Sequence, residues 1–369
     1  MKKSAILLAL LLFLSVLLPT LSTPLVWATE DWWTTMEPMP TNRSSLGVAV
    51  VNGKIYAIGG VQSDINEEYD PAKNSWTTKM PMPTARGDFA IVVLQDRIYA
   101  IGGLTRSGQW TAELTGVNEV YDPATDSWAT KKSIPVPKAG LSANVVEGKI
   151  YLIGGFTQLA NSTVKTTSDE TLVYDPIDDS WTTKTPIPTA TLDYATAVVD
   201  DKIYVISGTS RAYSDSLVNP TQIYDPKTDT WSQGAPIPYP IQQAAAGATT
   251  GLGAPKGIYV IGGFTGFYWS TNKNQVYDPE KDTWSSGADM ITPSFGLDAT
   301  VVDDQLYAIG GCPGYLQGST ATVEKYTPAD YIPEFPSWTP LLITLVAVVA
   351  VAVVYRHDLH KQNQRSENQ

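Results

Sequence analysis

Three basic residues lie at equivalent places in the chain, where together they could bind an anion. Arg43, Arg86 and Lys138 each come 16 residues before the first glycine of a Gly-Gly pair. A guanidinium group presents paired donors to a carboxylate, so this spacing favours a site for an anion. The alternative is structural, with the same cations paired to Asp side chains or loop carbonyls. The corresponding positions of other units hold uncharged residues, namely Thr191, Ser294 and, beside an insertion near residues 247–257, Gln242 and Gln243.

Aromatic residues form a second candidate binding surface. Phe267, Tyr268 and Trp269 are consecutive, and Trp110 lies in a corresponding loop nearer the N-terminus. Exposed aromatic rings stack on sugar rings or become buried against a protein partner. We therefore expect these residues to bind a ligand, with packing of the loop onto its neighbour as the alternative.

The residue counts exclude several kinds of catalytic site. The chain has one cysteine, Cys312, and two histidines, His357 and His360, which both fall within its last 13 residues. The body before them has no imidazole, which excludes Ser-His-Asp, Cys-His and multi-histidine metal centres there. We expect no catalytic residues, no metal and no cofactor. The net charge of -12 also argues against nucleic acid as a partner, since its phosphates are bound mainly by Lys and Arg.

A sixfold repeat must position these residues. A double glycine, or Ser207-Gly208 in one unit, follows a short apolar run that holds a tyrosine, such as residues 55–58. Each pair is followed by Tyr-Asp-Pro, or by Tyr-Thr-Pro in the last unit. In the first five units a tryptophan comes seven residues after that tyrosine. Strand-length runs rich in Val, Ile and Tyr, bounded by Gly, Pro and Asp, indicate about four strands per unit.

This pattern resembles the kelch repeat, and six units match over residues 31–328. The resemblance implies an all-β fold, a six-bladed β-propeller with one four-stranded blade per unit. It also places Arg43, Arg86 and Lys138 in a ring around the mouth of a central channel. Residues 31–40 closely resemble residues 75–83, so we expect the N-terminal segment to supply the outer strand of the sixth blade and close the ring.

The two ends predict a membrane protein. Residues 1–28 read as a signal peptide, with Lys2 and Lys3 before an apolar run, and the body spans residues 29–330. Residues 331–337 form a linker, and residues 338–355 are uncharged and long enough to cross a bilayer. The basic tail, residues 356–369, is expected in the cytoplasm, with the propeller outside the cell. Within the linker, residues 333–336 resemble the PEF-type sorting signals of archaeal surface proteins.

Three functions remain open on this reading. The first is a non-catalytic, membrane-anchored, cell-surface propeller that binds a protein or a glycan. The second is an enzyme acting on acidic sugars, because some bacterial kelch propellers isomerise sialic acid. The third is a structural component of a surface layer. For the enzyme, the residues that would hold the carboxylate are Arg43, Arg86, Arg106 or Arg211, and the candidate proton carriers are Glu113, Asp88 and Asp193.

Overall fold

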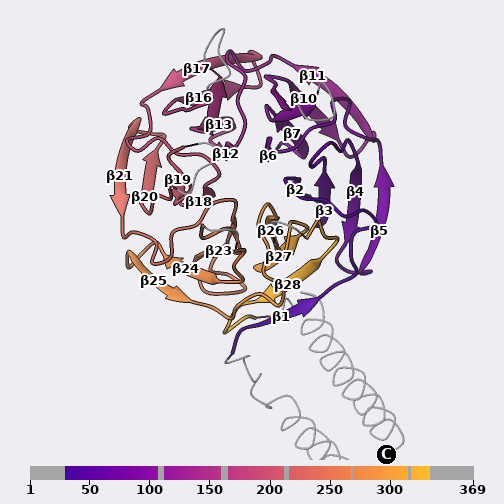
Figure 1. Ribbon diagram of the computed structural model, residues 1–369, viewed down its shortest axis with the longest axis vertical. Coiled ribbons are helices and arrows are strands. Elements are labelled where there is room, and N and C mark those ends of the chain that lie inside the picture. Colours follow the sequence, from indigo (N-terminus) through magenta and orange to yellow (C-terminus); the bar gives the residue numbers. More distant parts are fainter. Residues whose placement is uncertain are drawn as a thin grey trace, which may run out of the picture. The chain divides into compact units, whose positions relative to one another are not determined.

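The computed structural model describes residues 30–106, 112–158, 165–211, 216–266, 269–314 and 317–332. Within these ranges the chain forms six four-stranded antiparallel sheets, and Figure 1 shows them as blades around a central axis. Two short two-stranded ribbons extend loops of the second and third blades. The prediction of an all-β, six-bladed propeller is confirmed.

Each blade runs from the axis outward through four strands. The innermost strands are β2 (Gly47–Val51), β6 (Ala90–Leu94), β12 (Ser142–Val146), β18 (Ala195–Val199), β22 (Ala245–Ala248) and β26 (Asp298–Val302). The second strands are β3 (Lys54–Ile58), β7 (Arg97–Ile101), β13 (Lys149–Ile153), β19 (Lys202–Ile206), β23 (Ile258–Ile261) and β27 (Gln305–Ile309). The third strands are β4 (Asn66–Asp70), β10 (Asn118–Asp122), β16 (Thr171–Asp175), β20 (Thr221–Asp225), β24 (Asn274–Asp278) and β28 (Val323–Thr327).

The outermost strands complete the blades. In blades one to five they are β5 (Ser75–Lys79), β11 (Ser127–Lys131), β17 (Ser180–Lys184), β21 (Thr230–Gly234) and β25 (Thr283–Ser286). In blade six the outermost strand is β1 (Trp32–Thr35). The ribbons are β8 (Leu104–Arg106) with β9 (Ala112–Leu114), and β14 (Phe156–Gln158) with β15 (Lys165–Thr167).

Local sequence explains the inner hairpin of each blade. In blade one, Asn52 and Gly53 have φ angles of 51° and 71°, the left-handed conformations that join two tightly paired strands. The side chains of residues 55–58 in the second strand are all buried. Gly59 ends that strand with a φ of 64°, and a Cβ there would lie 2.8 Å from the carbonyl oxygen of Arg86. The first glycine of the pair therefore permits both the turn and the close approach of the next loop.

The tyrosine, aspartate and tryptophan of each unit hold neighbouring blades together. In blade two, Asp126 accepts hydrogen bonds from the hydroxyl of Tyr121 at 2.5 Å and from the backbone N–H of Met80, which follows blade one, at 2.8 Å. The indole N–H of Trp128 donates to the carbonyl of the same Met80 at 2.9 Å. The same trio of contacts recurs at the other seams, with Asn74, Asp179, Asp229, Asp282 or Asp31 in the acceptor position.

The N-terminal strand closes the ring, as the sequence predicts. β1 pairs with β28, with Trp33 opposite Tyr326, and Figure 1 shows the indigo N-terminal strand beside the end of the propeller. The indole N–H of Trp33 donates to the carbonyl of Ala288 at 2.7 Å. Blade six is therefore built from both ends of the propeller, so none of its four strands is left unpaired.

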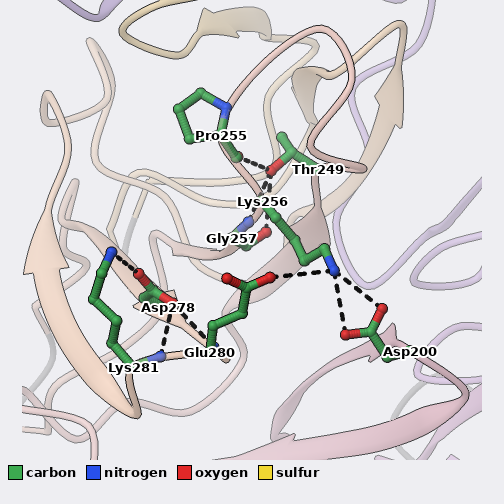
Figure 2. Close-up of polar contacts among 8 residues, drawn as sticks. All are labelled: Asp200, Thr249, Pro255, Lys256, Gly257, Asp278, Glu280 and Lys281. Atoms are coloured by element: carbon green, nitrogen blue, oxygen red, sulfur yellow. Dashed lines mark hydrogen bonds and ion pairs between the residues drawn. The ribbon is translucent and has the colours of Figure 1, made fainter.

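Blade five carries the insertion that offsets its sequence. Residues 249–257 lengthen the turn between β22 and β23, and Thr249 closes this loop by accepting the N–H of Gly257 at 3.0 Å. Figure 2 shows Lys256 reaching Asp200 of blade four at 3.1 Å and Glu280 of blade five at 3.6 Å. The insertion thus links two blades through one ammonium group.

The predicted signal peptide (1–28), the PEF-like sequence (333–336), the apolar segment (338–355) and the tail (356–369) all lie outside the described residues. In the part of the chain that the structure describes, no helix is long and apolar enough to cross a membrane.

Candidate functional site

Two sets of loops lie on one face of the propeller. Because the four strands of a blade alternate in direction, the loop after the double glycine and the loop before the next inner strand emerge on the same side. We call this side the double-glycine face. The opposite side carries the tight turns and the insertion of blade five, and we call it the turn face.

Arg43 and Arg86 lie beneath the double-glycine face as buried ion pairs. Arg43 is 3% exposed and contacts the carboxylate of Glu67 at 2.6 Å. Its other terminal nitrogen donates to the carbonyls of three residues of blade one, Ala57, Gly59 and Ile65, at 2.9–3.2 Å. Arg86 is fully buried and pairs with Glu119 at 2.5 Å.

Lys138 is bound in a similar way. It is 1% exposed, forms an ion pair with Glu170 at 2.7 Å and donates to the hydroxyl of Ser168. All three cations are thus engaged by carboxylates and oxygen atoms of their own blades. This is the structural alternative, and an anion could reach them only after those ion pairs were broken.

A ring of backbone hydrogen bonds narrows the channel at the double-glycine face. It contains one residue from each blade, two positions before the inner strand, and each has a positive φ of 52–62°. The N–H of each residue donates to the carbonyl of its counterpart in the preceding blade, at 2.7–3.1 Å. The six residues are Ser45, Asp88, Gly140, Asp193, Gln243 and Gly296.

A cavity of about 250 Å³ lies in the channel at this ring. All six ring residues line it, together with residues of the six inner strands. Asp88 and Asp193 belong to the ring on either side of Gly140, where a Cβ would lie 2.7 Å from a carboxylate oxygen of Asp193. The channel therefore brings together two of the three carboxylates that the sequence suggests as proton carriers.

The two carboxylates affect each other. Burial, with a smaller contribution from the negative charge of Asp88, raises the pKa of Asp193 to about 7. Burial also raises the pKa of Asp88, against the opposing effects of a hydrogen bond from Ser45 and the positive charge of Lys165. The third candidate carrier, Glu113, is exposed in β9, and Arg211 is exposed in the double-glycine loop of blade four.

Exposed apolar side chains on this face gather around blade five. Trp269 of its double-glycine loop is 74% exposed. The loops that precede β22 and β26 carry Tyr239 and Ile291, which are 57% and 55% exposed. Both loops hydrogen-bond to blade five, through Gln275 and Asn272. We call Tyr239, Trp269 and Ile291 the blade-five patch.

Sequence reasoning identified only one member of this patch. Trp110, Phe267 and Tyr268 lie outside the described residues, whereas Tyr239 and Ile291 were missed. The available signal was an apolar residue beside proline in the loop before an inner strand, as in residues 237–240 and 290–293. Within the described residues, no group of three or more His, Cys, Asp or Glu side chains is placed to hold a metal ion.

Comparison with known proteins agrees with this architecture. Residues 118–330 match the family model described as Attractin/LZTR1 beta-propeller, and residues 42–83 and 85–133 match the Kelch motif. The chain belongs to the kelch-repeat β-propeller family. This kelch propeller also resembles the solved structure of YjhT, with a TM-score of 0.69 and 18% identity, over 78% of this chain and 95% of that one. At this identity the likeness shows the fold alone.

The curated relatives are longer proteins. Kelch-like protein terF of Aspergillus terreus is 28% identical over 86% of this chain and 60% of its own length. Kelch-like protein 36 of Bos taurus is 29% identical over 74% of this chain and 44% of its own length. Beta-scruin of Limulus polyphemus is 26% identical over 64% of this chain and 20% of its own length. The kelch propeller thus spans 60% or less of these relatives.

Proposed function

We propose that this kelch propeller is a non-catalytic cell-surface protein that binds a protein or glycan ligand on its double-glycine face. The observation that carries the proposal is the 74% exposure of Trp269 between Tyr239 and Ile291. Kelch propellers generally mediate protein interactions, which supports a protein as the first ligand class to test. The sequence of the chain ends supports the membrane location.

The physical argument rests on what exposed aromatic side chains can gain by binding. Trp and Tyr bury a large surface at little cost in side-chain entropy, and they dominate many interfaces. The loops that carry the patch are fixed by hydrogen bonds, including those of Tyr239 N–H and C=O to the amide of Gln275. A ligand therefore meets side chains on a rigid frame, which limits the ordering cost of binding.

The test is a binding screen with the purified full-length chain against surface proteins and glycans. Trp269→Ala should weaken the ligand found by about 30-fold, as expected for an interface anchor worth about 2 kcal/mol. Ile177→Ala is the matched control, because Ile177 is 88% exposed in a tight turn of the turn face. Unchanged affinity in Trp269→Ala and Tyr239→Ala, with loss in Ile177→Ala, would place the ligand on the wrong face for this proposal.

A second candidate, an enzyme acting on acidic sugars, is favoured by the channel cavity. A carboxyl group with a pKa of about 7, like that of Asp193, can both give and accept a proton near neutral pH. Asn144 also lines the cavity, and its buried Nδ2 has no hydrogen-bond partner in the described structure. Against it, Arg43 and Arg86 are occupied by Glu67 and Glu119.

The two candidates are separable by one assay. If the enzyme reading holds, the full-length chain interconverts the anomers of sialic acid, followed by NMR, and Asp193→Asn abolishes the activity. The binding proposal expects no interconversion above the uncatalysed rate, and it expects Asp193→Asn to leave ligand affinity unchanged because Asp193 lies in the channel away from the patch loops.

A further inference from the structure

Blade six repeats the surroundings of the buried arginines but lacks the arginine. In blades one, two and six, the third strand has a buried Glu as its second residue, and a methionine precedes the loop residue that faces it by four positions. That loop residue is arginine in blades one and two but serine in blade six. The three sets are Met39, Arg43 and Glu67; Met82, Arg86 and Glu119; and Met290, Ser294 and Glu324.

Blades four and five show how the chain manages without a cation. Their third strands carry Gln222 and Gln275 at the Glu position. Each amide accepts one backbone N–H and donates to one backbone C=O of the facing loop, at residues 189 and 239, over 2.7–3.0 Å. A neutral amide thus accompanies a loop without arginine, whereas blade six keeps a carboxylate.

Glu324 is deeply buried, with 1% exposure. Its two oxygens accept the backbone N–H groups of Ile291 and Thr292 at 3.0 and 2.9 Å. Within the described residues it forms no salt bridge, unlike Glu67 and Glu119. A buried carboxylate with hydrogen bonds but no counter-charge is costly, because desolvation disfavours its charged form.

A small cavity lies where the guanidinium group would be. It measures about 10 Å³, and its lining includes Ser294, Ala308, Gly310, Thr322 and Glu324. In blade one the carbonyls at the positions equivalent to 308, 310 and 322 are those that accept hydrogen bonds from Arg43. The cavity is therefore surrounded by the oxygen donors of a cation site and has room for one water-sized occupant.

We propose that the blade-six cavity binds one sodium-sized monovalent cation, which replaces the guanidinium group of blades one and two. Carboxylate and carbonyl oxygens are the donors that hard cations prefer, and carbonyls can replace the hydration shell of a monovalent ion. A single positive charge balances the single carboxylate, whereas a divalent ion would leave a net buried charge. Burial raises the pKa of Glu324, so a proton competes with the cation for this site.

The site is coupled to the double-glycine face. Glu324 holds the backbone of Ile291, which belongs to the blade-five patch. Neutralising the carboxylate by a cation keeps these hydrogen bonds in a charged but balanced state. Occupancy is therefore expected to stabilise the loop before β26, independently of any ligand of the patch.

The experiment measures the melting temperature of the full-length chain in sodium, potassium and choline chlorides at equal ionic strength. Sodium should raise the melting temperature in a saturable way, with an elevenfold shift of the folding equilibrium when sodium is at about ten times its dissociation constant. The sodium effect should be larger at pH 8 than at pH 5, because protonation of Glu324 removes the charge that binds the ion.

Three variants identify the site. Ser294→Arg and Glu324→Gln should each lose the sodium-specific increment, and the second remains informative if the first fails to fold. Ser286→Arg is the control, because it adds the same group at an exposed position of β25 and should keep the increment. Equal melting temperatures of the unmodified chain in sodium and choline, or a sodium effect that persists in Glu324→Gln, would overturn the proposal. An equal or larger effect of potassium would overturn the sodium-sized selectivity.

Discussion

The carboxylate of Asp31 accepts a hydrogen bond from the hydroxyl of Tyr326, across 295 residues of sequence. The same carboxylate accepts the backbone N–H of Ala288, from the loop after blade five, at 2.5 Å. Asp31 therefore repeats, with a residue from the N-terminal segment, the contacts that Asp126 makes within one unit. Closure of the propeller thus uses the same chemistry as its other five seams.

Removing this acceptor should destabilise the whole ring. We expect Asp31→Ala to lower the free energy of unfolding by about 1–3 kcal/mol, because the buried hydroxyl of Tyr326 and the N–H of Ala288 lose their partner. Asp31→Asn is the control, since Asn74 fills the same position in blade one and accepts from Tyr69 at 2.6 Å. Denaturant unfolding of the full-length chain measures both, and equal losses in the two variants would contradict the assigned role.

The buried pair of Arg86 and Glu119 should behave as a structural unit. Arg86→Thr leaves Glu119 buried without a counter-charge and should cost about 3–5 kcal/mol of stability. The double variant Arg86→Thr with Glu119→Gln copies Thr191 and Gln222 of blade four and should recover more than half of that loss. A double variant no more stable than the single one would show that the ion pair is not what Arg86 contributes.

The channel carboxylates predict a pH dependence of stability. The pKa of Asp193 rises from an ordinary value of 3.8 to about 7 in the folded chain, so between these values the folded state binds more protons than the unfolded state. Stability is therefore fully present below pH 4 as far as Asp193 is concerned, and it falls as the pH rises through 7, by up to ~4 kcal/mol. Asp298 acts in the same direction, since burial raises its pKa to about 7.

Asp193→Asn should flatten part of this dependence. Thermal melts between pH 4 and pH 8 compare the variant with the unmodified chain, and the expected result is a smaller loss of stability across that range. A control with Asp201→Asn, a residue of a tight turn on the turn face, should leave the slope unchanged. A slope that is identical in all three proteins would mean that Asp193 is ionised in the channel at low pH.

The fold was predictable because its determinants are local and repeated. The double glycine, the Tyr-Asp-Pro turn and the tryptophan each act within one unit or across one seam, so six copies at regular spacing define six blades. Closure was predictable for the same reason, since residues 31–40 copy the outer-strand sequence of blade one.

The candidate site was predicted less well, for physical reasons. The spacing of Arg43 and Arg86 gives their position on a loop but not the direction of the side chains, which turn inward to Glu67 and Glu119. These partners lie at unequal separations, 24 and 33 residues, because the intervening loops differ in length. The proximity of Asp88 and Asp193 depends on the backbone ring, which forms only when all six blades are assembled.

The central claim is that the ligand contacts the blade-five patch. The most direct measurement is site-specific photocrosslinking of the bound ligand from residue 269, compared with residue 177 on the turn face. The account predicts one discrete adduct from position 269, none from position 177, and loss of the adduct when unmodified chain is added in excess. Adducts of equal yield from both positions, or an adduct from position 177 alone, would contradict it.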